Sequence, residues 1–144
     1  MHADKHLFLI RVYLCSSAAI DSDEFFSNVY SRRILAELEV RDAVVPEVWP
    51  FEIANIIFVS FSKRKRITEQ QIGEYLDRLR AMPIRVESND LWANIGLESR
   101  ARKWNVAAYD AAYLDLASRR NLPLATADER LKKAAVAGGI SVLN

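Results

Sequence analysis

Short apolar runs alternate along the chain with longer segments in which apolar residues recur every three or four positions. The runs are rich in β-branched and aromatic side chains, which predicts interior strands, whereas the longer period predicts helices with one apolar face. Alternation of this kind is typical of a parallel sheet covered by helices on both faces. We therefore predict an α/β fold of three layers, α/β/α, with a central, mainly parallel sheet. Strands are predicted at residues 6–14, 42–45, 83–87, 122–126 and 140–143.

Capping residues, prolines and glycines place the boundaries of the predicted helices. Thr68 and Gln71 form a capping box, and the helix that follows them ends before Pro83. Pro46 is expected in the first turn of a helix that runs to about Arg66. The remaining helices are predicted at residues 25–38, from a cap at Ser88, Asn89 or Asp90 to about residue 101, around residues 113–117, and from a capping box of Thr126 and Glu129 to Gly138 and Gly139.

The composition is that of a globular protein without covalent cross-links. The chain has 144 residues, of which 51% are hydrophobic and 27% charged, so we expect a single domain over residues 1–144. Cys15 is the one cysteine, which excludes an intramolecular disulfide and multi-cysteine zinc sites and favours a reducing compartment, the cytoplasm. The formal net charge of +1 means that binding of nucleic acid requires a local basic patch.

The most apolar segment, residues 44–61, is not expected to span a membrane. It contains Glu47, Glu52 and Asn55, and burial of two carboxylates and an amide in lipid is costly. We predict a helix of the protein core instead, and no membrane partner.

Three acidic residues lie at positions where a carboxylate has either a functional or a structural role. Glu52 has mostly apolar neighbours and shares its helix face with Asn55. It is therefore a site residue, a carboxylate at the edge of the helix, or a carboxylate paired with an arginine. Asp110 lies near a helix start, as a site residue or a helix cap. Asp128 directly follows a predicted strand, at the sheet edge where ligands bind in open α/β sheets. Its alternative is a first-turn acid of the next helix.

In such a sheet the ends of the strands and the starts of the helices lie at the same edge. Glu52, Asp110 and Asp128 are therefore expected to lie close together. Carboxylates close together do not all stay ionised unless a cation neutralises them. Oxygen ligands suit Mg²⁺ or Mn²⁺ rather than zinc. A divalent ion so held orients water and lowers its pKa for attack on a phosphodiester. The pattern predicts hydrolytic nuclease chemistry.

Three blocks of the sequence resemble the VapC-like PIN domains in their order and spacing: VVPEVWPFEIAN at residues 44–55, YDAAYL at 109–114 and LATAD at 124–128. The similarity extends over about residues 44–143. It implies a PIN fold and a Mg²⁺-dependent endoribonuclease that acts on cellular RNA. It also implies a homodimer and a cognate antitoxin that blocks the acidic site.

The resemblance also implies roles for single residues. Glu52, Asp110 and Asp128 take the metal-binding and catalytic positions of the family, and Asn55 and Thr126 are supporting polar groups near the metal.

The family pattern has an aspartate at the end of the first strand, and Cys15 occupies that place here. A thiol is a poor ligand for Mg²⁺. Asp21 or Asp23 either replaces the missing carboxylate or caps the next helix. The alternative function is therefore a PIN module that binds an antitoxin or RNA without cleavage.

The basic residues and the tryptophans each allow two interpretations. Residues 63–66 (KRKR), with Arg100, Arg102 and Lys103, form either a track for the RNA backbone or solvated helix ends. Trp92 and Trp104 either stack on bases or pack in the core or on a dimer surface.

Overall fold

The computed structural model describes residues 7–11 and 29–143, and it divides the chain into two compact units. The sheet unit comprises residues 1–13, 42–49 and 84–144, and the helical unit comprises residues 14–41 and 50–83. The single domain over residues 1–144 stays a prediction.

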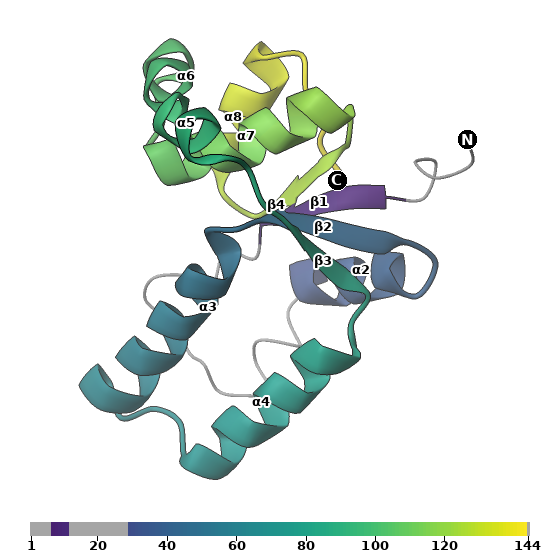
Figure 1. Cartoon of the computed structure of the whole chain (residues 1–144). Helices are drawn as coiled ribbons and strands as arrows, with labels where there is room; N and C mark the ends of the chain where they lie inside the picture. Colours follow the sequence, from purple (N-terminus) through teal and green to yellow (C-terminus); the bar gives the residue numbers. More distant parts are fainter. Residues whose placement is uncertain (1–6, 12–28, 144) are drawn as a thin grey trace. The chain divides into compact units, whose positions relative to one another are not determined.

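Four parallel strands make up the sheet (Figure 1). They are β1 (Leu7–Arg11), β2 (Asp42–Pro46), β3 (Ile84–Glu87) and β4 (Leu124–Thr126). Their order across the sheet is β3-β2-β1-β4. This arrangement confirms the predicted α/β class with a parallel central sheet.

The central strand is apolar because both of its faces are covered. Phe8, Leu9 and Ile10 of β1 are fully buried, as are Val45 of β2 and Leu124 of β4. The sequence of such a strand is a continuous run of apolar residues instead of an alternation of apolar and polar residues. This explains why the apolar runs in the sequence indicated β1, β2 and β4 correctly.

The strand predicted at residues 140–143 is wrong and is reduced to one bridge. Val142 pairs with Leu124, whose N–H donates to the carbonyl of Ser141 over 2.8 Å, while the Leu143 N–H donates to the carbonyl of Leu124 over 2.9 Å. Because β4 has three residues, it offers only a short partner for this segment.

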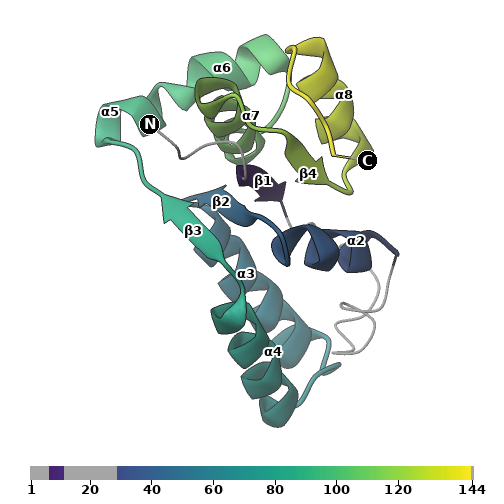
Figure 2. The ribbon, with the colours of Figure 1, turned by 90° about the vertical axis from the view of Figure 1, so that its right-hand side faces the viewer.

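Four helices complete the sheet unit: α5 (Leu91–Ile95), α6 (Leu97–Trp104), α7 (Ala108–Arg120) and α8 (Glu129–Ala137). The helix α7 contacts β1, β2 and β4, and α8 contacts β4. Figure 2 shows α6 running beside α7. The single helix predicted from about residue 88 to 101 is therefore two helices, which meet at Gly96. Asp90 is the N-cap of α5, and the Asp90 carboxylate accepts hydrogen bonds from the N–H groups of Trp92 and Ala93.

The helical unit contains α2 (Val29–Leu38), most of α3 (Trp49–Phe58), the π-helical turn η1 (Val59–Lys63) and α4 (Glu69–Ala81). The capping box of Thr68 and Gln71 is confirmed, with both of its hydrogen bonds present. The predicted place of Pro46 is wrong. It is the last residue of β2, paired with Glu87, and the helix begins at Trp49, with Pro50 in its first turn.

The helix α3 is not a core helix throughout. Trp49 and Ile53 are buried, but Phe51 is 75% exposed and Phe58 is 53% exposed. Within the described residues, no helix combines the length and the apolar character needed to cross a membrane.

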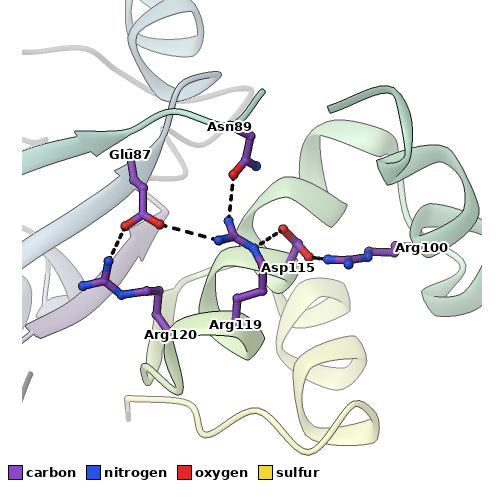
Figure 3. A network of polar contacts seen from close by, with 6 residues as sticks. All are labelled: Glu87, Asn89, Arg100, Asp115, Arg119 and Arg120. Atoms are coloured by element: carbon purple, nitrogen blue, oxygen red, sulfur yellow. Dashed lines mark hydrogen bonds and ion pairs between the residues drawn. The ribbon is translucent and has the colours of Figure 1, made fainter. Parts of the chain in front are cut away.

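A buried carboxylate on α7 organises a network of side chains in the sheet unit (Figure 3). Asp115 is 3% exposed, and its Oδ2 accepts a hydrogen bond from Nε of Arg119 over 2.8 Å. Arg100 of α6 pairs with its other oxygen. Arg119 and Arg120 also reach Glu87 at the end of β3, with Nη1 to Oε distances of 3.6 and 2.8 Å. The network thus joins α7 to both α6 and β3.

Replacing Asp115 with Ala should lower the free energy of unfolding by about 2 kcal/mol, because hydrogen bonds to a buried charged group are lost. Urea denaturation measures this change. Glu98→Ala is the matched control, since Glu98 and Arg102 form another i,i+4 pair in the same unit but are 65% and 76% exposed. That control should cost less than about 1 kcal/mol. Equal losses in the two variants would contradict a special contribution from the buried carboxylate.

Candidate active site

The strand order points to one edge of the sheet. The strands β2 and β3 lie on one side of β1, and β4 lies on its other side. In open parallel sheets, ligands bind beyond the carboxyl ends of the strands where the order reverses in this way. At that edge, Arg11 at the end of β1 is paired with Thr126 at the end of β4. The residues that follow β4 are therefore the first to consider.

Asp128 is fixed by hydrogen bonds on both sides of its Cα atom. Its N–H donates to Oγ1 of the fully buried Thr126 over 3.2 Å. Its Oδ1 accepts from the N–H groups of Arg130 and Leu131 over 2.8 and 3.2 Å, which makes Asp128 the N-cap of α8. The predicted capping box of Thr126 and Glu129 is wrong, because the N-cap is Asp128. Thr126 is the last residue of β4, as predicted, and its hydroxyl accepts the hydrogen bond from the Asp128 N–H.

Asp110 is the third residue of α7. The N-cap of this helix is Ala107, which has no capping side chain, so the reading of Asp110 as the cap is wrong. A carboxylate in the first turn of a helix interacts favourably with the helix dipole. The helix α7 begins shortly after the end of α6 in the chain. Asn105, in the left-handed conformation (φ 52°), is the C-cap of α6.

Asp110 and Asp128 line the same pocket, which has a volume of about 510 Å³. Both side chains are half-buried. The pocket is formed by the end of α6, the start of α7 and the first two turns of α8. Its other lining residues are Trp104, Asn105, Val106, Arg130, Lys133 and Ala134.

Glu52 and Asn55 lie on α3 in the helical unit. Glu52 is half-buried in the first turn of that helix, and Asn55 is exposed. Their convergence with Asp110 and Asp128 stays a prediction. Cys15, Asp21 and Asp23 lie outside the described residues.

The donor set of the pocket suits a hard divalent cation. Mg²⁺ is commonly bound through one or two carboxylates, with water or substrate phosphate in its remaining positions, and Asp110 and Asp128 supply two carboxylates from two helices. Within residues 7–11 and 29–143, no three His, Cys, Asp or Glu side chains form a group that could hold a metal ion. The two aspartates therefore fit the ion as a partial ligand set.

Arg130 and Lys133 line the pocket but were not among the predicted site residues. The available signal was their spacing, because residues three apart share a helix face, and both follow the candidate Asp128 closely. The prediction of a basic track for the RNA backbone loses support, because Arg100 is paired with Asp115 and Arg102 with Glu98.

The two tryptophans differ in their surroundings. Trp92 is 75% exposed, so its placement in the core is wrong for this chain. Trp104 is half-buried and forms part of the pocket wall.

The double role of Asp128 can be separated by two substitutions. Asp128→Ala removes the N-cap and should lower the free energy of unfolding by about 1 kcal/mol. Asp128→Asn keeps a side chain that caps helices about as well as aspartate, so it should retain most of the stability while it removes the charge. Thermal and urea denaturation of both variants test this, and equal destabilisation by Asn and Ala would contradict the capping role.

Comparison with known protein families agrees with the fold. A search of curated proteins found no match for this chain. The model of the PIN domain family matches residues 17–137. PIN domains are generally metal-dependent nucleases that bind RNA, and their α/β/α fold is consistent with the parallel sheet described above. The match covers most of the 144 residues, and the chain belongs to the PIN domain family.

Proposed function

We propose that this chain is a Mg²⁺- or Mn²⁺-dependent endoribonuclease that hydrolyses RNA phosphodiesters. The observation that carries this proposal is that Asp110 and Asp128, from the starts of two different helices, line one pocket at the carboxyl edge of β4. A carboxylate pair at this edge is what a metal-dependent nuclease requires.

The roles of the two aspartates follow from how they are held. Both capping N–H groups donate to the same Asp128 oxygen, Oδ1, which sets the direction of the carboxylate. Asp110 is held by α7, whose Asp115 network joins it to α6 and β3. Two carboxylates on anchored helices can hold an ion without a costly reorganisation. A bound divalent ion would polarise the phosphate and acidify an attacking water.

Glu52 is proposed as a third carboxylate of the same site, with Asn55 beside it. The support is the block at residues 44–55, which resembles the corresponding block of VapC-like PIN domains. Thr126 is proposed to support the site from within the sheet, since its buried hydroxyl accepts the hydrogen bond from the Asp128 N–H.

We also propose the biological role of a toxin in a VapBC-type toxin–antitoxin pair, acting in the cytoplasm as a homodimer and blocked by its cognate antitoxin. The three sequence blocks support the VapC type. Leu91, Trp92 and Ile95 on α5 are 66%, 75% and 55% exposed, and a surface of this kind suits the dimer contact. A neighbouring gene for a small DNA-binding antitoxin would add support.

Cys15 provides the reason to keep the alternative, a PIN module that binds an antitoxin or RNA without cleavage. On the family pattern, the residue at this place is a carboxylate that contributes to the metal site. A protonated thiol supplies neither the charge nor the hard oxygen.

The test is calorimetric titration with Mg²⁺ and Mn²⁺, with cleavage of a mixed RNA substrate followed in parallel. We expect Asp110→Asn and Glu52→Gln to reduce cleavage at least about 100-fold, as expected when a group that stabilises the transition state is lost. Glu98→Gln, an exposed and ion-paired carboxylate on α6, should leave cleavage unchanged. Cys15→Asp should strengthen metal binding.

The outcomes separate the two functions. Cleavage by the unaltered chain that disappears in Asp110→Asn supports the ribonuclease. Cleavage only after Cys15→Asp supports the binding module. Cleavage that persists in both Asp110→Asn and Asp128→Asn would show that the pocket is not the active site.

A further inference from the structure

The pocket that contains Asp110 and Asp128 also has a basic side. Arg130 and Lys133 lie one turn apart on α8, and both line the pocket. Both residues are exposed. The four side chains carry two negative and two positive formal charges, so the basic pair offsets the repulsion that the aspartates would exert on a phosphate. An RNA backbone can therefore approach the acidic pair.

The charges of Arg130 and Lys133 are not neutralised by ion pairs within the described part of the chain. The neighbouring Lys132 differs, because its Nζ atom lies 2.7 Å from Oε1 of Glu129 and it is not among the lining residues of the pocket. Two adjacent lysines thus have different environments: Lys133 is available to an anion in the pocket, whereas Lys132 is paired on the helix surface.

Trp104 supplies an aromatic wall. A Cβ atom built on Gly138 would lie 3.1 Å from the indole Nε1 atom, so the indole packs closely against the end of α8. Gly138 leaves the space that this packing requires. An aromatic ring next to two cations is the combination by which proteins bind single-stranded nucleic acid, with a base on the ring and phosphates on the cations. The volume of about 510 Å³ lies within the range of small-ligand pockets.

We propose that this pocket is a nucleotide subsite for single-stranded RNA, in which Arg130 and Lys133 bind backbone phosphates beside the acidic pair and Trp104 stacks on a base. The choice of RNA rests on the proposed function, while the subsite itself rests on the pocket residues. An unpaired strand is required because a base must leave its helix to stack on a side chain.

The experiment measures binding of the full chain to a short fluorescein-labelled single-stranded RNA by fluorescence anisotropy. EDTA is present, so that binding is observed without metal-dependent cleavage. Lys133→Gln and Arg130→Gln should each weaken binding, and each should reduce the slope of log affinity against log salt by about 0.7, the value for one lost phosphate contact on a single strand. Lys132→Gln makes the same change of charge on the same helix and should leave the slope unchanged.

The aromatic wall is tested in the same assay. Trp104→Leu should weaken binding about fivefold or more, because stacking on one base is lost. Phe58→Leu is the control, since Phe58 is 53% exposed on α3 and does not line the pocket, and the affinity of this variant should stay within about twofold of the unaltered chain. Thermal denaturation of each variant shows whether it is folded.

Two results would overturn the subsite. Equal effects of Lys132→Gln and Lys133→Gln would show a response to overall charge alone. Displacement of the RNA by an acidic peptide, with the same dependence on Arg130 and Lys133 and no effect of Trp104→Leu, would show a surface for protein instead.

Failure of the subsite is distinguishable from failure of the proposed function. Binding that depends on Lys133 but not on Lys132, in a chain that cleaves no RNA with either metal, supports the subsite and removes the enzyme. Cleavage that depends on Asp110, combined with binding that is indifferent to Arg130, Lys133 and Trp104, supports the enzyme and removes the subsite.

Discussion

The pairing of β4 with β1 determines which side chains meet in the sheet unit. β4 has only three residues, and all of them are buried, so its position depends on the ladder in which Leu124 lies beside Leu9 and Thr126 beside Arg11. The helix α7 precedes this strand and α8 follows it, and both contact it. The pocket between the starts of these helices therefore exists because a short parallel strand is held in one register. A shift by one residue would turn Thr126 to the other face.

The anchoring of α7 complements this pairing. Its inner face consists largely of small and apolar side chains, among them Ala111, Leu114 and Ala117, and small residues allow a helix to approach a sheet closely. Apolar packing has little directional preference, however, and Asp115 adds directional bonds to α6 and to the end of β3 through its arginine partners. Close packing and oriented ion pairs together fix the helix that carries Asp110. In this way a network that does not line the pocket contributes to the precision of the pocket.

The sequence was most informative where local chemistry decides the structure. The apolar runs of β1 and β2 and the capping box at Thr68 depend on nearby residues, and they were predicted correctly. Pro46 was assigned to a helix start because its local signal suits one, yet strand pairing with Glu87 keeps it in the sheet. Thr126 was expected to cap the helix that follows its strand, but Asp128 is the cap. The pocket residues show the same division. Asp110 and Asp128 could be predicted because the topology brings strand ends and helix starts to one edge, whereas Arg130 and Lys133 depend on which face of α8 lines the pocket.

The capping role of Asp128 has an evolutionary consequence. Asparagine and serine also cap helices well, so a substitution at this position can remove the charge while α8 keeps its start. If Asp128 binds a metal ion as proposed, the stability of the fold and the chemistry of this position can change independently. On the proposed function, one substitution here would abolish hydrolysis and still leave a stable domain, on which binding functions could persist. Divergence of nucleases into binding proteins requires no passage through an unfolded intermediate when the catalytic group doubles as a cap.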